Sequence, residues 1–425
     1  MKKASLAREA FLSPAAHPLS VLIGVDWADK EHAYAIRTPD GKLSIGSFKH
    51  KPDAIRQWVE QWVRQYPNVP LKLCIESSRG SLINALREFK QIEIFPVNPA
   101  AMSYFRKSEA HGGGKSDPVD ARLILKYLEQ KQSNMEPLQQ DSPETTELRE
   151  LTRQRRELVE ARVALANQLG ALWKEYFPAI LELKPARAYT DFVIALVSKY
   201  PTLEEIQKAG KTKLRKFFYS IRSREKLEER LATLMDAIPI TTDPVVLRTR
   251  SRLCKCIATQ IAALNNSIKG YDAEIKKQVQ RHRDYAIVDK LPGASYTTKA
   301  RIIASLGDDR NRYDNAESLQ AAAGIAPITE RSGQSCRIYA RWACSKYMKQ
   351  TFHEYAGLSL TKCEWAKSYY NAMVAKGKSK QMARRALAYK WIRIIYRCWK
   401  NNQAYDEAHY LARMTASGSR YASES

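Results

Sequence analysis

Residues 21–48, VLIGVDWADKEHAYAIRTPDGKLSIGSF, decide the fold of the first part of the chain. The segment begins with an unbroken apolar run at 21–25, which is typical of a buried strand. Residues 32–37 and 42–48 alternate between apolar and polar side chains, and Asp40-Gly41 between them is a strong signal for a hairpin turn. The segment therefore predicts three consecutive antiparallel strands.

Helical and strand patterns alternate beyond this hairpin. Some segments place apolar residues at helical spacing, whereas others are short apolar runs. The expected elements are a helix at 53–65, a strand at 71–75, a helix at 81–89, a strand at 92–97 and a helix at 118–128. The order βββαβαβα predicts an α/β domain with a ribonuclease H-like sheet, in which the fourth strand lies beside the first.

The composition of the whole chain excludes several classes of protein. With 425 residues and 44% hydrophobic side chains, the chain can bury a core, so a mainly disordered state is excluded. No apolar run approaches the ~20 residues of a membrane helix, and charged residues and prolines in residues 1–20 argue against a signal peptide. Seven cysteines, an odd number spread thinly, are typical of reduced thiols in a cytosolic protein.

The charge indicates the partner. The chain carries 70 Lys plus Arg against 45 Asp plus Glu, a formal net charge of +25. Residues 331–400 hold 16 of these basic residues and only two acids, Glu354 and Glu364, with aromatic residues interleaved. A helical core with a solvated basic face is the simpler interpretation, but this asymmetry favours phosphate binding and stacking on bases.

Two long helices are expected in the middle of the chain. The first has a seven-residue repeat formed by Leu151, Leu158, Leu165 and Leu172. The second has apolar residues in alternating steps of four and three, at Ile257, Ile261, Leu264, Ile268, Tyr271 and Ile275. Both spacings are typical of coiled coils, so the helices are expected to pair with each other or with another subunit.

The third part of the chain is expected to be mainly helical. Leu291-Pro292-Gly293 and the segment that ends at Leu306-Gly307-Asp308 resemble a helix-hairpin-helix, which binds nucleic-acid backbone through its glycine turn and a helix N-terminus. The expected domains are an N-terminal extension at 1–20, the α/β domain at 21–140, a coiled-coil helical domain at 141–284 with an insert at about 185–244, a mainly helical domain at 285–405, and a flexible tail at 406–425.

Four carboxylates carry the strongest chemical signal. Asp26 and Glu76 each follow a strand, and Asp117 and Asp120 lie three residues apart at the start of a helix, on one face. Converging carboxylates repel one another unless a cation neutralises them, and oxygen ligands suit Mg²⁺ or Mn²⁺. Singly, each acid has a simpler explanation, such as Asp117 capping a helix that begins with Pro118. Together they predict a two-metal site for phosphoryl transfer.

Several stretches resemble the Asp-Glu-Asp-Asp (DEDD) transposase family of insertion sequences, which includes pilin-gene invertases and bridge-RNA-guided recombinases. IGVDWADKEHAYAI, CIESSRG and HGGGKSDPVDARLI contain the four acids. LPGASYTTKARIIASLGD and LQAAAGIAPITERSG are similar to the C-terminal transposase domain of the family. The second of these contains a Gly-x-x-Pro…Ser-Gly pattern formed by Gly324, Pro327, Ser332 and Gly333.

The resemblance implies a RuvC-like first domain in which the four acids hold Mg²⁺ or Mn²⁺. It implies that Ser332 is a nucleophile that forms a covalent phosphoserine link with cleaved DNA, and Ser335 is the alternative. It also implies a homo-oligomer, a dimer or tetramer, whose active sites combine domains of different protomers. It further implies a structured guide RNA that pairs with target and donor DNA. The protein is also expected to be nucleoid-associated in a prokaryotic cytosol.

Basic residues near these motifs are expected to contact nucleic acid. They are Lys115, Arg122, Lys299, Arg331, Arg337, Arg341 and Lys346. From the residues alone, Arg331 and Arg337 either hold phosphates or face solvent.

These expectations favour an RNA-guided DNA transposase or recombinase, and two alternatives stay open. One is a RuvC-like Holliday-junction or structure-specific nuclease, which hydrolyses DNA with metal ions and uses no serine. The other is a non-catalytic scaffold that binds RNA or DNA and would tolerate the loss of its acids.

Overall fold

The computed structural model describes residues 20–109, 117–183, 188–333, 335–342, 344–416 and 418. The chain divides into two compact units, Met1–Gln140 and Asp141–Ser425, and each is described by itself. Within the described ranges, every helix is too short or too polar to cross a lipid bilayer.

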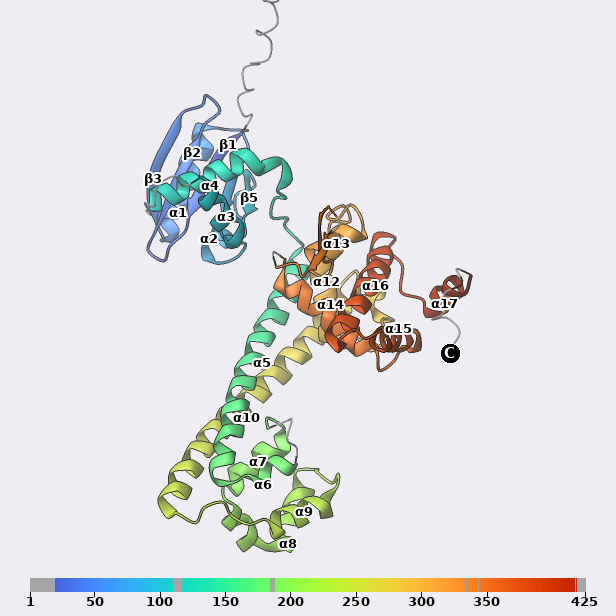
Figure 1. Cartoon of the computed structure of the whole chain (residues 1–425). Helices are drawn as coiled ribbons and strands as arrows, with labels where there is room; N and C mark the ends of the chain where they lie inside the picture. Colours follow the sequence, from blue (N-terminus) through green and yellow to red (C-terminus); the bar gives the residue numbers. More distant parts are fainter. Residues whose placement is uncertain are drawn as a thin grey trace, which may run out of the picture. The chain divides into compact units, whose positions relative to one another are not determined.

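A five-stranded mixed sheet forms the centre of the first unit (Figure 1). Its strands are β1 (Val21–Asp26), β2 (Glu31–Arg37), β3 (Leu43–Lys49), β4 (Leu71–Ile75) and β5 (Ile92–Pro96), in the spatial order β3-β2-β1-β4-β5. The first three strands are antiparallel neighbours, whereas β4 runs parallel to β1 and to β5. The predicted hairpins, and the placement of the fourth strand beside the first, are confirmed.

Helices cover both faces of this sheet. They are α1 (Pro52–Gln65), α2 (Ser81–Leu86), α3 (Pro99–Glu109) and α4 (Asp117–Lys131), and a short 3₁₀ turn, η1 (Gln132–Asn134), follows α4. Trp58 of α1 and Ile83 of α2 belong to the core on one face, and Phe105 of α3 and Leu125 of α4 belong to the core on the other. The alternation of side chains along each strand supplies both cores.

The sequence-based prediction missed α3. Its start nevertheless carries a recognisable signal, because Pro99 is its first residue and follows Asn98. The Asn98 side chain accepts a hydrogen bond from the Ala100 N–H at 2.8 Å, as N-terminal capping residues do.

Two long helices form the spine of the second unit (Figure 1). They are α5 (Pro143–Tyr176) and α10 (Pro244–Arg281). Contacts between them run in opposite directions along the two helices, and they include Arg155 with Asp272, Arg162 with Asn265, and Trp173 with Cys254. The two helices are therefore antiparallel partners within one chain.

The buried positions of these helices differ from the predicted seams. Of the four leucines expected on α5, only Leu172 is buried, and residues 153–165 contain no buried side chain. On α10, Ile257, Ile261, Ile268 and Ile275 are buried, whereas Leu264 and Tyr271 are half-buried. The physical reason is that the pair serves two separate hydrophobic cores, one at each end, and its middle is a more exposed bridge.

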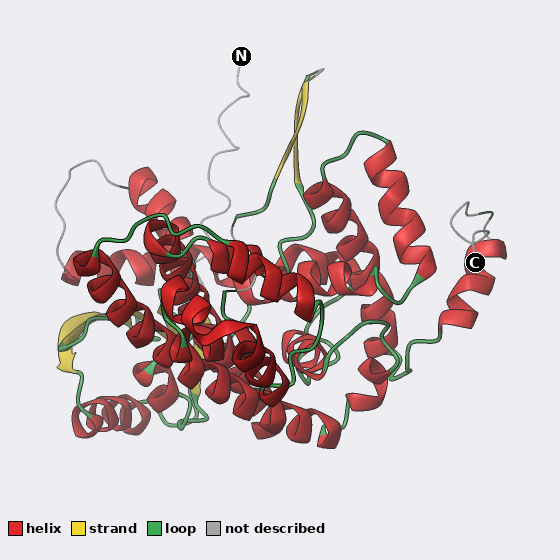
Figure 2. Cartoon of the chain, turned by 90° about the horizontal axis from the view of Figure 1, so that it is seen from below, coloured by secondary structure: helices red, strands yellow, loops and turns green. Residues whose placement is uncertain are grey.

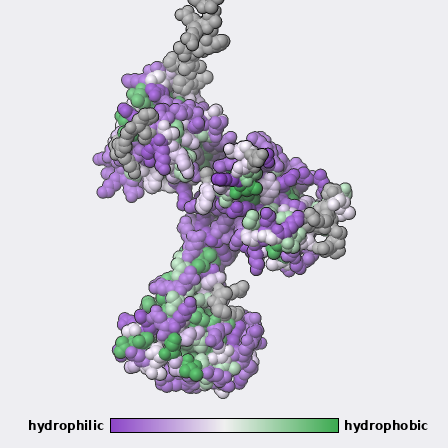
Figure 3. All heavy atoms as spheres, in the orientation of Figure 1, coloured by the Kyte–Doolittle hydropathy of each residue, from purple (hydrophilic) through white to green (hydrophobic). Residues whose placement is uncertain are grey.

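Smaller helices gather at each end of the spine. One end carries α6 (Ala179–Leu183), α7 (Asp191–Lys199), α8 (Leu203–Ser220, broken at Gly210 where φ is +73°) and α9 (Leu227–Asp236). Hydrophobic side chains gather on the surface of this end in the face that Figure 3 shows, and Ile238 and Ile240 are 86% and 59% exposed. The other end carries α11 (Tyr285–Asp289), α12 (Tyr296–Leu306), α13 (Ala316–Ala322), β6 (Ile328–Ser332), β7 (Ser335–Tyr339), α14 (Lys346–Ser359), α15 (Glu364–Ala375), α16 (Lys380–Lys400) and α17 (Glu407–Ala416).

The last helix corrects the expectation of a flexible tail from residue 406. Residues 407–416 form α17, because part of this segment is apolar and can pack. Met414 is buried, and the ring of Tyr410 lies 4.9 Å from that of Trp365.

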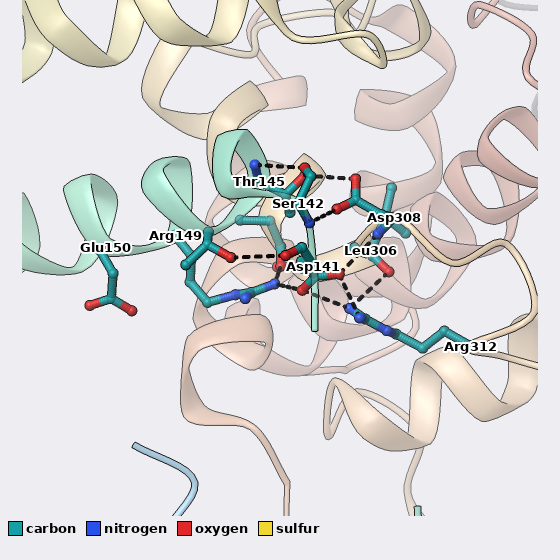
Figure 4. Close-up of polar contacts among 12 residues, drawn as sticks. Asp141, Ser142, Thr145, Arg149, Glu150, Leu306, Asp308 and Arg312 are labelled. Atoms are coloured by element: carbon teal, nitrogen blue, oxygen red, sulfur yellow. Dashed lines mark hydrogen bonds and ion pairs between the residues drawn. The ribbon is translucent and has the colours of Figure 1, made fainter. Parts of the chain in front are cut away.

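A buried polar network fixes the start of the second unit (Figure 4). Asp141 accepts hydrogen bonds from Arg149, from Arg312 at 2.6 Å and from the Asp308 N–H at 3.0 Å. Asp308 in turn accepts from the backbone of Ser142 and, at 2.8 Å, from the Thr145 hydroxyl. The network joins the first turn of α5 to the segment after α12, so the spine and the C-terminal core form one piece.

Candidate active site

Asp26 ends β1 on the face of the sheet that α4 covers. Gly24 lies two residues earlier and faces the same way. A Cβ atom at Gly24 would lie 2.3 Å from the Leu125 backbone nitrogen and 2.5 Å from the Ala121 carbonyl oxygen. Only glycine lets α4 cross β1 this closely, and this crossing directs the start of α4 towards the end of β1.

The other predicted acids reach the same edge. Val25 pairs with Ile75, so β1 and β4 end side by side and Glu76 follows directly. Asp117 begins α4, and Asp120 is buried in its first turn. The four acids that the sequence singles out therefore come from three elements to one edge of the sheet.

The pKa of Asp26 is affected by the convergence of these acids. Burial, followed by the charges of Asp120, Asp117 and Glu76, raises the pKa of Asp26 to about 6. Arg106 opposes the shift but does not cancel it. Ionising Asp26 thus costs free energy, because the anions around it outweigh the positive charge nearby.

Arg106 is a site residue that the sequence analysis missed. It lies on α3, and its Nη2 atom is 3.0 Å from Oδ1 of Asp120. Asp120 is buried, so the guanidinium supplies a charge-assisted hydrogen bond that offsets part of its desolvation. The Asn98-Pro99 signal for α3 could have placed this arginine near the acids.

The four carboxylates at this edge of the sheet suit a hard divalent cation. Carboxylate oxygens are the ligands that Mg²⁺ and Mn²⁺ prefer. As the side chains stand in the described part of the chain, no three Asp, Glu, His or Cys residues meet closely enough to hold an ion. The crowding of the acids nevertheless fits such an ion, because a bound cation would relieve the repulsion that adds to burial in raising the pKa of Asp26.

A chain of hydrogen bonds links the loops that follow β1 and β4. The Ala28 N–H donates to Nδ1 of His32 at 3.1 Å, so His32 carries its proton on Nε2, which lies 2.8 Å from Nδ1 of His50. Nε2 of His50 is 2.9 Å from the Ser81 hydroxyl. Burial and the neighbouring His50 lower the pKa of His32 to about 4, so His32 is uncharged at neutral pH.

Ser332 lies in the second unit, at the tip of the β6–β7 hairpin. Every residue of the two strands is exposed, and Figure 2 shows the hairpin extending away from the helices of its unit. Ser332 pairs with Ser335 across the hairpin, and Gly333 in the turn has a left-handed φ of +55°. The predicted nucleophile and its alternative are thus neighbours on an accessible tip.

The register of the hairpin places Arg331 and Arg337, both predicted to contact nucleic acid, on opposite faces. Paired residues share a face, and faces alternate along each strand. Ser332 pairs with Ser335 and Glu330 pairs with Arg337, so Arg337 shares the face of Ser332. Arg331 pairs with Cys336 on the opposite face.

The base of the hairpin explains the motif glycine. Gly324 has a φ of +63°, and a Cβ atom there would lie 2.2 Å from Sγ of Cys344. The Ser345 N–H also donates to the Ala322 carbonyl at 3.2 Å. The close packing of Gly324 on Cys344 and this hydrogen bond therefore hold together the segments that lead into and out of the hairpin.

The other residues predicted to contact nucleic acid differ in their exposure to solvent. Arg122 and Lys346 are exposed and Arg341 is half-buried, whereas Lys115 lies outside the described residues. Lys299 is buried, and its Nζ atom is 2.7 Å from Oδ1 of Asp289. In this conformation Lys299 is therefore engaged internally, which does not match its predicted role.

The segment that resembles a helix-hairpin-helix also packs inward. Its first helix, α11, has only five residues. Gly293, in the turn, has a φ of +73°, and a Cβ atom there would lie 2.5 Å from the Leu358 carbonyl of α14. This turn packs against α14, so it does not present the open backbone expected of such a motif.

The two units together define a class of protein: an α/β domain with clustered acids, followed by a helical domain that presents a serine on an exposed hairpin. Comparison with known families finds two matches, the first of which extends beyond the first unit into α5. Residues 23–178 match a DEDD transposase family, and residues 285–371 match the transposase family described as IS116/IS110/IS902. The two matches together cover more than half of the chain.

Similar proteins extend over nearly the whole length. The "Mini-circle putative transposase for IS117" of Streptomyces coelicolor is 25% identical, covering 93% of this chain and 97% of that protein. The "Insertion element IS116 uncharacterized 44.8 kDa protein" of Streptomyces clavuligerus is 26% identical, covering 91% and 96%. The chain belongs to the IS110/IS116/IS902 family of insertion-sequence transposases.

Proposed function

We propose that this transposase is an RNA-guided DNA recombinase that joins DNA strands through a covalent phosphoserine intermediate. The observation that carries the proposal is the convergence of Asp26, Glu76, Asp117 and Asp120. Burial, followed by the charges of the other three acids, raises the pKa of Asp26 to about 6. Crowded carboxylates of this kind are typical of sites that bind divalent cations for phosphoryl transfer. The order of the five strands and the parallel pairing of β1 with β4 support a ribonuclease H-like assignment for the first unit.

The acids would hold Mg²⁺ or Mn²⁺. When bound, the cation supplies charge stabilisation to a phosphate and lowers the pKa of a hydroxyl near it. Arg106 orients Asp120 through their ion pair. The hydrogen bonds through His32 and His50 connect the loop after Asp26 to the start of α2, which follows Glu76 in the chain.

Ser332 would be the nucleophile, with Ser335 as the alternative. Its Oγ atom forms a bond to the scissile phosphorus as the bond to the departing nucleoside oxygen breaks, and the serine proton is transferred as that oxygen is protonated. The reverse exchange with a hydroxyl of a second strand releases the serine. One phosphoester replaces another at each step, so no external energy source is needed for rejoining.

A structured RNA would supply sequence specificity by base pairing, and the protein would read backbone and shape. The net charge of +25 and the exposed Arg122 and Lys346 suit this role. RNA that copurifies with the full-length protein tests it by sequencing. We expect one discrete structured species with loops that match both DNA ends of the element, whereas heterogeneous RNA removed by salt would contradict guidance.

Asp26→Asn tests the role of the acids. We expect strand cleavage to fall by at least about 10³-fold with Mg²⁺ present, while salt-dependent DNA binding stays within about twofold, because the change removes a ligand and not a phosphate contact. Equal loss of binding and cleavage would indicate a structural role. Undiminished cleavage would mean that the catalytic metal site lies elsewhere in the protein.

A further inference from the structure

Helices α14 and α16 bring basic side chains together in excess over acids. We call this group the α14–α16 basic cluster, and it consists of Lys349 and His353 on α14 and Arg384 and Arg385 on α16. The two helices pack on each other through buried residues that include Phe352 and Leu387. The cluster therefore sits on a rigid base.

The guanidinium of Arg384 lies across the backbone of α14. A Cβ atom at Gly357 would be 3.1 Å from Nε of Arg384, so the glycine makes room for this side chain. Nε is itself buried and lacks a hydrogen-bond partner among the described residues. Arg384 is thus held by packing, and one of its N–H donors is not satisfied within the described residues.

His353 lies beside both arginines. Its ring hydrogen-bonds the backbone of Gln381, in the first turn of α16. Burial, followed by the charges of Arg384 and Arg385, lowers the pKa of His353. The charges of the two arginines therefore add to the effect of burial, which places both of them near His353.

The acids of this region are engaged elsewhere. Glu354 accepts from Arg301 at 2.6 Å and from Arg156 at 3.1 Å, both outside the cluster. Glu364 pairs with Lys367 of its own helix at 3.6 Å. Residues 380–400 contain no acid at all, and the charge of Glu354 acts on His353 more weakly than the charges of the two arginines, so the cluster keeps an excess of positive charge.

We propose that the α14–α16 basic cluster binds the phosphodiester backbone of a nucleic acid. The planar guanidinium groups of Arg384 and Arg385 match the geometry of phosphate oxygens, and Lys349 and His353 extend the positive surface. The site uses neither the acids of the first unit nor the hairpin. The proposed binding site can therefore be tested independently of the proposed cleavage chemistry.

The test is the double substitution Arg384→Gln/Arg385→Gln in the full-length protein. Binding would be measured by fluorescence anisotropy over a salt series, with a labelled DNA duplex and a labelled RNA stem-loop of equal helix length. Loss of two phosphate contacts should weaken binding by roughly 10- to 30-fold near 0.15 M salt, and should reduce the slope of log K against log salt by about 2. The probe that responds identifies the nucleic acid.

Two further variants make the result specific. Lys208→Gln/Arg215→Gln removes the same charge from residues already paired with Glu204 and Glu228, and should change the slope by much less. Arg384→Lys/Arg385→Lys keeps the charge and should keep the slope. An unchanged slope in the glutamine variant, or an equal fall in the paired-residue control, would overturn the proposal.

Two measurements cover the remaining outcomes. Nucleic acid should protect Arg384 and Arg385 of the unmodified protein from phenylglyoxal, and full reactivity in its presence would overturn the proposal even if the glutamine variant fails to fold. Sedimentation of the nucleic-acid-free protein shows whether the cluster instead binds a second copy. A changed oligomeric state with unchanged nucleic-acid affinity would likewise contradict it.

Discussion

Asp26 is the residue whose charge responds most to the surrounding acids. Its pKa of about 6 means that, without metal, ionising Asp26 destabilises the fold as pH rises from about 4 through 6. A shift of two units corresponds to about 2.7 kcal/mol, and solvent screening of this half-exposed group reduces that to about 1 kcal/mol.

We therefore expect Asp26→Asn to raise the melting temperature by a few degrees in metal-free buffer at pH 7.5, and to lose this advantage near pH 4. Added Mg²⁺ should stabilise the unmodified protein and not the variant. Thermal unfolding at several pH values, with and without Mg²⁺, measures both effects. A variant that is less stable than the parent at pH 7.5 without metal would contradict the clustering.

Arg337 and Arg331 offer a second comparison at this scale. Because Arg337 shares the face of Ser332 and Arg331 does not, Arg337→Gln should slow strand cleavage by roughly 10- to 100-fold and Arg331→Gln by much less. Single-turnover cleavage with saturating DNA separates this from weaker binding. Equal effects of the two changes would mean that the face of the hairpin is irrelevant.

The residues of the site were predictable from the sequence in part. Asp26, Glu76, Asp117 and Asp120 could be found because they follow strands or begin a helix, which are local signals. Arg106 could be found only through the Asn98-Pro99 signal for α3, and the His32–His50 link could not be found, because the partners lie 14 and 18 residues apart and their contacts depend on how α3 and β3 pack. The burial of Lys299 was likewise not visible in a local pattern.

At the scale of elements, the crossing of α4 over β1 positions the acids. Gly24→Ala should cost about 1–3 kcal/mol, because the added carbon meets the backbone of α4, which cannot move without separating Asp120 from Asp26. The pKa of Asp26 should fall towards its usual value in the same variant. Denaturant unfolding and NMR titration measure the two changes.

Gly170→Ala in α5 is the matched control, since a Cβ atom there has nothing within 4 Å. It should leave the stability unchanged or raise it by about 0.5–1 kcal/mol through helix propensity. If both substitutions behave alike, the close approach of α4 is not what requires Gly24.

The elements also show where sequence patterns fail. Alternation and the Asp40-Gly41 turn correctly gave β1, β2 and β3, because each of these strands has its own hydrophobic pattern. The leucine repeat on α5 correctly predicted a long helix, but only one of its four leucines, Leu172, is buried. Which leucines are buried depends on α6–α9 and on the C-terminal helices, and neither is encoded in the repeat.

At the scale of the second unit, the Asp141 network joins the spine to the C-terminal core. Burial pushes the pKa of Asp141 up, but the hydrogen bond from Arg312 and the charge of Arg149 outweigh it and hold the pKa below its usual value. This contribution to stability is present above about pH 4 and is lost as pH falls further.

Asp141→Asn should therefore cost about 3–5 kcal/mol at pH 7, because it leaves Arg149 and Arg312 buried without their counter-ion. The variant should also lose less stability than the parent below pH 4. Glu150→Gln, on the exposed surface of the same helix, should cost less than about 1 kcal/mol. Calorimetry at pH 7 and pH 3 distinguishes these outcomes.

The whole molecule is proposed to act through a covalent bond between Ser332 and DNA, and mapping that bond is the most direct test. The full-length protein would be incubated with its copurified RNA, labelled DNA and Mg²⁺, denatured and digested, and the nucleotide-bearing peptide identified by mass spectrometry. We expect the nucleotide on Ser332, with no adduct in Ser332→Ala, in Asp26→Asn or without divalent metal. Cleaved DNA without any adduct would contradict the phosphoserine mechanism and favour a metal-dependent nuclease.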